Sequence, residues 1–349
     1  MTAPIVNKEI VMLHPTRMMI QSCIDSLRDG YRQIYNDQMP EYLDLLEWSA
    51  PIALAKLTSS NAPYHNLEHT VLVLEAGLEI ISGKQAQEGT VSCQDWMQFI
   101  LALMCHDIGY AKDICQADQP AAQIYTSGLQ GETVTLPPNA TSASLAPYHV
   151  DRGKQFVQET FANQPLVDVA AIQQMIELTR FPVPAQALYQ ETNSYAGLVR
   201  AADLIGQLSD PNYLDKLPAL FCELVEVGNH KTFGYSRPED LRSSYPRFFR
   251  QVVVPYIRDG MRYVASSRHG RYILTHLYAN VRQVERDQQR QMDCDAGLDR
   301  TQASDPEVSI NRDRIFWGSL TDSQDEQGNV RALPTKPQVL VSDYHPSRY

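Results

Sequence analysis

Apolar residues recur every three to four positions along most of the first 286 residues, and this spacing predicts helices. No run is clearly typical of a β-strand, apart from weak candidates in the C-terminal tail. The pattern therefore predicts an all-α fold. The expected helices cover residues 17–35, 41–57, 66–83, 96–110, 148–161, 167–178, 195–208, 213–227, 246–267 and 271–286.

Two of these segments are apolar over more than one helical face. The segment that begins near Asn66 carries two apolar stripes and is expected to end at Gly83. The segment 96–110 is almost uniformly apolar until its end, where Gly109 is a candidate stop signal. Helices without a polar face are usually buried inside a bundle, so these two are expected to lie at its centre.

The texture of the sequence divides the chain into four parts and one long loop. Residues 116–147 are rich in Pro, Ala, Ser, Thr and Gly, which is typical of a lid or a disordered loop. The tail is polar, with apolar islands at residues 315–317 and 339–341 through which it could dock. The expected parts are N-terminal helices packed on the core (1–58), a helical core (59–228), further helices of the same unit (229–288) and a polar, partly disordered tail (289–349).

Charge and composition narrow the classes of partner. The net charge is -11 and no dense Lys/Arg run occurs, so no duplex nucleic acid partner is expected. Six cysteines without a CxxC pair indicate reduced thiols in a cytoplasmic protein. No apolar run approaches the ~20 residues of a membrane span, and no signal peptide is recognised, so no membrane association is expected. Nothing in the sequence indicates the oligomeric state.

Imidazoles and carboxylates stand at three places in otherwise apolar helices. His65 and His69 are four residues apart and share a helical face, provided that the helix has begun by His65. His106 and Asp107 end a hydrophobic helix, and Asp203 lies inside another. Burying such groups costs several kcal/mol unless they are paired or bind a metal. Two imidazoles and two carboxylates suit one or two ions of Mg²⁺, Mn²⁺, Fe²⁺ or Zn²⁺.

Each of the three features also has a plain structural explanation. Two histidines four apart are more often structural or solvent-facing than metal ligands. The His106–Asp107 pair could form a polar helix terminus that reaches solvent. Asp203 could form an ion pair with Arg200 on the preceding turn. The combination of all three favours the metal interpretation.

The order H…HD…D resembles that of the HD-domain superfamily of metal-dependent phosphohydrolases. The first motif is similar to the HNxxH signature of the cyclic-nucleotide phosphodiesterase branch. The resemblance covers roughly Tyr64 to Leu224. It is carried by the segments YHNLEH (64–69), LALMCHDIGY (101–110), IQQMIELTRFP (172–182) and LVRAADLIGQLSDP (198–211).

The resemblance implies a multi-helix HD-type bundle in which residues 59–228 are the metal-binding core. His69, His106, Asp107 and Asp203 would hold the metal, and Asp107 would bridge two ions. His65 would lie just outside the ligand shell and give a proton to the leaving oxygen. The competing assignment makes His65 a ligand and His69 structural; the match at the following asparagine favours the first assignment.

A second metal would depend on further residues. His149 is a candidate ligand or hydrogen-bonding partner there, with a solvent-exposed histidine at a helix start as the alternative. Many two-metal members carry two intermediate histidines, whereas His149 is the only histidine between Asp107 and Asp203. Tyr110 stands where some relatives have a basic residue. The candidate phosphate-binding residues are Lys112, Arg152, Lys154, Arg180 and Arg200, with Lys112 favoured because it follows Asp107 closely.

These features predict an enzyme that cleaves a small anionic phosphoester by a metal-activated hydroxide. Nucleotides and cyclic nucleotides are candidate substrates. Glycine-rich phosphate loops and the GxSxG motif are absent from the sequence, which excludes several common enzyme classes. Two alternatives remain open: an HD-fold di-iron oxygenase, and a non-catalytic metal-binding regulatory module.

Overall fold

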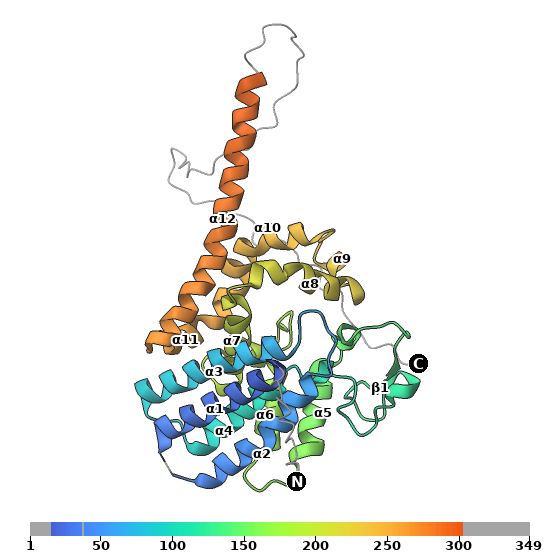
Figure 1. Cartoon of the computed structure of the whole chain (residues 1–349), viewed down its shortest axis with the longest axis vertical. Coiled ribbons are helices and arrows are strands. Elements are labelled where there is room, and N and C mark those ends of the chain that lie inside the picture. Colours follow the sequence, from blue (N-terminus) through green and yellow to red (C-terminus); the bar gives the residue numbers. More distant parts are fainter. Residues whose placement is uncertain (1–14, 37, 303–349) are drawn as a thin grey trace, which may run out of the picture. The chain divides into compact units, whose positions relative to one another are not determined.

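The computed structural model describes residues 15–36 and 38–302, with residues 295–302 described by their backbone alone. The chain divides into two units, Met1–Ala296 and Gly297–Tyr349. The described elements are helices and one small β-hairpin, which confirms the all-α prediction (Figure 1). None of the described helices combines the length and apolar character that crossing a membrane requires.

The helices of the first unit are joined mostly by short connections. Short 3-10 turns and one π-helical segment interrupt the α-helices. The elements are, in chain order, α1 (Pro15–Tyr35), α2 (Pro40–Leu57), α3 (Leu67–Glu88), α4 (Cys93–Cys105), η1 (Ile108–Tyr110), η2 (Pro120–Ala122), β1 (Ile124–Thr126), β2 (Thr133–Thr135), η3 (Ser142–Leu145), α5 (His149–Phe161), α6 (Val169–Glu177), η4 (Ala187–Gln190), α7 (Tyr195–Ser209), α8 (Tyr213–Glu226), α9 (Asn229–Thr232), α10 (Pro238–Phe248), η5 (Phe249–Val253), α11 (Val254–Val264) and α12 (Arg268–Gln302).

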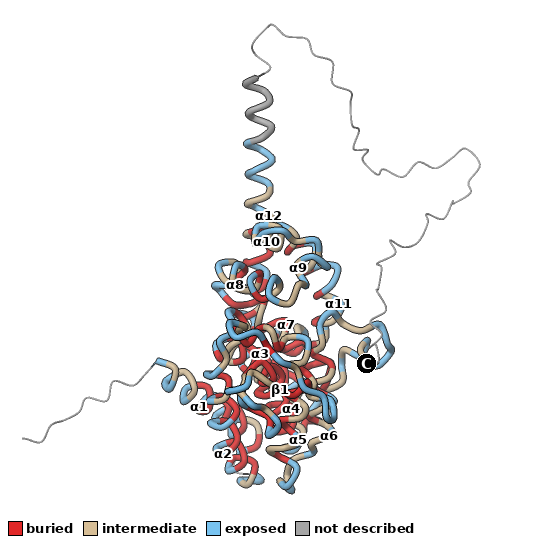
Figure 2. The backbone as a smooth tube through the Cα atoms, turned by 90° about the vertical axis from the view of Figure 1, so that its right-hand side faces the viewer, coloured by how far each residue is buried: buried red, intermediate tan, exposed pale blue. Residues whose placement is uncertain are grey.

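Helices α3, α4 and α7 form the centre of the core, where Figure 2 shows the buried backbone concentrated. Helix α3 packs on α7, α11 and α4. Gly206 allows the backbones of α3 and α7 to touch, because a methyl group there would lie 2.7 Å from Val73 Cα. Val73 follows His69 by one helical turn, and Gly206 follows Asp203 by nearly one turn. The close approach therefore brings the segments that carry these two residues together.

The central helix α3 begins and ends at identifiable caps. The Asn66 side chain accepts hydrogen bonds from the N–H groups of Glu68 and His69, at 3.0 and 3.3 Å. The helix ends at Gly89, whose φ of 67° is left-handed, so the prediction that it ends at Gly83 is wrong. Gly83 instead permits contact with α11, because a methyl group there would lie 2.1 Å from the carbonyl oxygen of Tyr263.

Three further sequence predictions need correction. The segment 116–147 is not structureless, because β1 and β2 pair as an antiparallel hairpin inside it. The helix predicted over 246–267 begins earlier, at Pro238, and contains the π-helical η5 between α10 and α11. The irregular tail does not begin at residue 289, since α12 continues to Gln302. The islands 315–317 and 339–341 lie outside the described residues, and the division at residues 58 and 228 stays a prediction.

Candidate metal centre

Four side chains carried by three helices converge on one point inside the bundle. His69 comes from α3, His106 and Asp107 follow α4, and Asp203 comes from α7. His69 Nε2 lies 3.3 Å from both Asp107 Oδ2 and Asp203 Oδ1. His106 Nε2 lies 3.3 Å from Asp107 Oδ2 and 3.7 Å from Asp203 Oδ1. The sequence motifs, up to 134 positions apart, thus contribute to one group of side chains, the metal cluster.

The metal cluster passes a chemical test for a divalent ion. His69 Nε2, His106 Nε2 and Asp107 Oδ2 are buried atoms without a hydrogen-bond partner. Each buried polar atom left unsatisfied costs about 1–3 kcal/mol, so an ion that accepts these lone pairs would remove the penalty. His106 Nδ1 contacts the carbonyl oxygen of Leu103 at 2.7 Å, so it keeps its proton and Nε2 is the nitrogen that would face an ion.

The charges of the metal cluster compensate one another when no ion is bound. Burial lowers the pKa of His69 and His106, but contact with Asp107 and Asp203 outweighs it and raises both pKa values to about 9. Burial likewise raises the pKa of Asp107, but His106 and His69 hold it well below its usual range. Imidazolium and carboxylate groups therefore neutralise the ion-free cluster, and a metal must displace the imidazolium protons.

Asp107 presents its second oxygen to a different histidine. Asp107 Oδ1 lies 3.7 Å from Nε2 of His149, whose side chain is 17% exposed. His149 Nδ1 contacts the carbonyl oxygen of Ala146 at 2.6 Å, so its Nε2 is also free to act as a ligand. Burial lowers the pKa of His149, which favours the neutral, ligating form. Asp107 therefore faces His69 and His106 with one oxygen and His149 with the other.

His65 approaches the cluster from outside helix α3. The condition for His65 and His69 to share a helical face is not met, because α3 begins at Leu67. Their ring centroids are nevertheless 5.4 Å apart. Among the described residues, His65, His69 and Asp107 form one group that could hold an ion, and His69, His106 and Asp203 form another. The sequence-based alternative of His65 as a ligand therefore stays open on distance alone.

An acid that the sequence analysis missed holds the His65 ring. Glu223 of α8 is buried, and its Oε2 lies 2.5 Å from His65 Nδ1. Its Oε1 accepts hydrogen bonds from the backbone N–H groups of Tyr64 and His65, at 2.6 and 3.0 Å. Burial lowers the pKa of His65, but the charge of Glu223 outweighs this effect and raises it. Sequence offers little to separate Glu223 from Glu226 on the same helix.

Tyr110, noted in the sequence only as a departure, lies between two of these histidines. Its ring stacks on His65 at a centroid distance of 4.8 Å and an interplanar angle of 3°. On its other side it stacks on His149 at 4.7 Å and 27°. The tyrosine therefore fixes the spacing of the two imidazoles that flank the metal cluster.

One protein family has a sequence model that matches the region containing all of the residues of the candidate metal centre described above. The sequence model of the Npun_R2479-like family matches residues 13–287. The chain belongs to this family. No curated protein matches the chain. In this Npun_R2479-like protein the matched region contains every residue of the metal cluster, and it ends within α12.

Two of the candidate phosphate-binding residues, Arg152 and Arg200, are buried and bound to protein acceptors, so the structure does not support a role for them in phosphate binding. Arg152 is fully buried, and its donors are all bound to protein acceptors. Arg200 is 2% exposed and donates hydrogen bonds to the carbonyl oxygens of Tyr189 and Glu191. Its guanidinium therefore points away from Asp203, and the alternative of an Arg200–Asp203 ion pair is also wrong.

The remaining cations of the Npun_R2479-like chain differ in how fully they are neutralised. Lys154 and Arg180 form ion pairs with Asp151 and Glu177. Lys112 donates a hydrogen bond to the carbonyl oxygen of Ala140 at 2.6 Å. Within the described part of the chain, Lys112 forms no ion pair, so two of its N–H groups remain for an anion. Lys112 accordingly stays the phosphate-binding candidate.

A groove of about 940 Å³ lies between the hairpin and helices α5 and α6. Its lining includes Lys154, Gln155 and Glu177, and none of the four residues of the metal cluster. The groove is therefore distinct from the metal cluster, beside which the side chains of His65, His149 and Asp203 are 17–19% exposed.

Proposed function

We propose that this protein is a metal-dependent phosphohydrolase of the HD type, acting on a small phosphoester. The observation that carries the proposal is the convergence of His69, His106, Asp107 and Asp203, of which the first three bury atoms that have no hydrogen-bond partner. Three buried groups of this kind would destabilise a purely structural core. They suit Mg²⁺, Mn²⁺, Fe²⁺ or Zn²⁺, and the two oxygens of Asp107 suit a pair of ions.

A divalent ion in the cluster would neutralise charge on a phosphoryl group and activate a water molecule for attack at phosphorus. The chain's own contribution is to orient the reactants. Asp107 and Asp203 supply the negative charge that retains the ion. Lys112 would contact a phosphate oxygen with the N–H groups that its bond to Ala140 leaves free.

His65 is the proposed proton donor to the leaving oxygen. Its Nδ1 is held by Glu223, so the ring cannot turn away from the cluster without losing a charge-assisted contact. Its Nε2 then carries the proton that is transferred. Stacking on Tyr110 keeps the ring plane fixed during this transfer.

The proposal extends to nucleotides and cyclic nucleotides as the substrate class to test first. The absence of a disulfide among the cysteines of the described residues agrees with a reducing cytoplasm as the place of action.

The test combines metal analysis with a substrate panel. The purified protein is loaded with Mn²⁺ or Mg²⁺ and assayed on phosphomonoesters, phosphodiesters and cyclic nucleotides. Asp107→Asn should lose both metal and activity, whereas the matched control Asp113→Asn, an exposed carboxylate, should lose neither. A metal-loaded protein inert to the whole panel would refute the proposal. Oxygen consumption by an iron-loaded sample would instead support the oxygenase alternative, and metal binding without turnover the regulatory one.

A further inference from the structure

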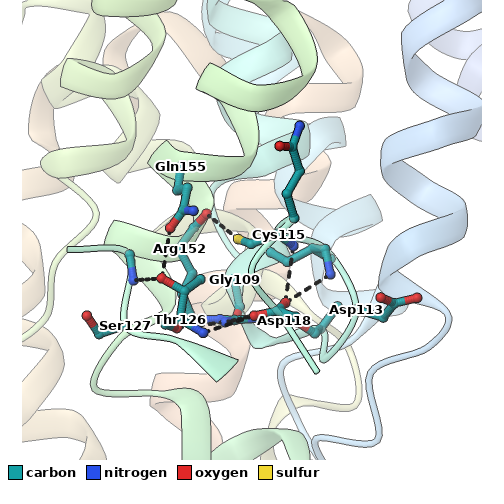
Figure 3. A network of polar contacts seen from close by, with 12 residues as sticks. Gly109, Asp113, Cys115, Asp118, Thr126, Ser127, Arg152 and Gln155 are labelled. Atoms are coloured by element: carbon teal, nitrogen blue, oxygen red, sulfur yellow. Dashed lines mark hydrogen bonds and ion pairs between the residues drawn. The ribbon is translucent and has the colours of Figure 1, made fainter. Parts of the chain in front are cut away.

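A fully buried arginine joins three segments beside the metal cluster. The five N–H donors of Arg152 each meet one acceptor (Figure 3). Nε donates to the carbonyl oxygen of Gly109, and Nη2 donates to that of Ala111, each at 2.8 Å. Nη1 donates to the carbonyl oxygen of Thr126 at 2.8 Å. Both Nη atoms also donate to the carboxylate of Asp118, at 3.0 and 3.1 Å.

Asp118 extends the connection into the loop that precedes the hairpin. Its Oδ2 accepts hydrogen bonds from the N–H groups of Ile114 and Cys115, at 3.2 and 3.1 Å. Its Oδ1 accepts one from the N–H of Thr126 at 3.0 Å. Arg152 and Asp118 thus form a closed network between the turn after Asp107, the loop and the first turns of α5.

The network joins the two segments that carry Asp107 and His149, whose side chains contact each other through Asp107 Oδ1. Gly109 follows Asp107 by two residues, and Arg152 follows His149 by three residues on the same helix. The turn and the helix touch at their backbones, because a methyl group on Gly109 would lie 1.9 Å from the carbonyl oxygen of His149. By holding these two segments together, the network helps to set the distance of 3.7 Å between His149 Nε2 and Asp107 Oδ1.

We infer that Arg152 and Asp118 are positioning residues that hold His149 against Asp107 as a metal ligand. This inference rests on the metal centre proposed above. A network that served only to attach the loop would need no bonds to the carbonyl groups of Gly109 and Ala111, which lie two and four residues after Asp107. Partners that orient a ligand in this way typically change metal affinity by about 10- to 100-fold when they are replaced.

The experiment titrates the metal-free full-length protein with Mn²⁺ and measures the number of bound ions and their Kd. Asp118→Asn preserves volume but replaces one acceptor by a donor, and Arg152→Lys preserves charge but loses the planar five-donor geometry. Both should weaken Mn²⁺ binding about 10- to 100-fold, to the same extent as His149→Ala. Combining Asp118→Asn with His149→Ala should add no further loss, and Asp113→Asn should match the wild type.

Each other result decides against the inference. Folded Asp118→Asn or Arg152→Lys proteins with wild-type Mn²⁺ affinity would overturn it. Losses that add to that of His149→Ala would show a general structural effect. An unchanged His149→Ala protein would show that no ligand is being positioned, while the four-residue cluster would stand. A wild-type chain that binds no Mn²⁺ would instead refute the proposed function itself.

Discussion

Glutamine in place of Glu223 should slow turnover while leaving the metal in place. The Glu223 side chain is 4% exposed, and it shares no contact with His106 or Asp203. A glutamine carbonyl oxygen can keep the two hydrogen bonds from the backbone N–H groups of Tyr64 and His65. The amide cannot keep the charge that faces His65 Nδ1 at 2.5 Å.

The magnitude follows from the one contact that is lost. A hydrogen bond to a charged group contributes about 1.5–3 kcal/mol. Since each 1.36 kcal/mol changes a rate about tenfold, kcat should fall roughly 10- to 150-fold. Loss of the negative charge also lowers the pKa of His65. An acid catalyst is lost as pH rises through its pKa, so the alkaline limb of the kcat profile should move to lower pH.

The assay is steady-state hydrolysis of the best substrate of the panel from pH 5 to 10, with bound metal measured on the same samples. Glu226→Gln is the matched control, since Glu226 lies three residues along the same helix and contacts Thr141 and Ser144 instead of His65. Wild-type kcat in a folded, metal-loaded Glu223→Gln protein would refute the proton-donor role. A parallel loss of metal would show that Glu223 supports the cluster and not the proton transfer.

Three further predictions concern the ring stack, the metal and the fold. Tyr110→Phe keeps both stacking contacts and should retain kcat within about threefold. Tyr110→Leu loses two aromatic pairs, each contributing about 0.5–1.5 kcal/mol, so its kcat should fall about 5- to 150-fold. Equal rates for the two variants would argue against the stack. Because His69 and His106 have pKa values of about 9 without metal, Mn²⁺ affinity should rise with pH up to about 9. Calorimetric titrations at several pH values would measure this rise. A Mn²⁺ affinity that does not change with pH would contradict the displacement of protons by the metal. Burial raises the pKa of Glu177, but ion pairs outweigh it and lower that pKa from 4.5 to about 2. Stability from this group is present above pH 4.5 and lost as pH falls towards 2, by at most about 3 kcal/mol, and urea unfolding of Glu177→Gln should not show this loss.

The sequence allows the helices and the residues of the metal cluster to be predicted for a physical reason. Apolar periodicity reports which helical face is buried, so the segments that form α3 and α4 are expected at the centre of the core. Inside such helices a carboxylate or imidazole is costly, which singled out His106, Asp107 and Asp203. Their convergence follows because the three helices that carry them pack against one another.

The residues that were missed depend on contacts between distant segments. Glu223 lies 158 positions after His65, and its helix contains a second glutamate that contacts a different loop. Arg152 resembles a phosphate ligand in the sequence, because nothing local reveals that Gly109 and Asp118 occupy its donors. Periodicity specifies a buried face, but it does not specify the partner that covers it.

A glycine follows each acid of the metal cluster closely, and each glycine permits a close backbone contact beside the cluster. Gly109 follows Asp107 by two residues, and Gly206 follows Asp203 by three. As sequence signals, glycines in helices indicate ends or weak points. In the structure Gly109 touches the backbone of His149, and Gly206 touches that of α3, the helix that begins with His69 in its first turn. A side chain at either glycine would push apart the segments on which these ligands stand, so each acid and its glycine act together to place a carboxylate within reach of an imidazole.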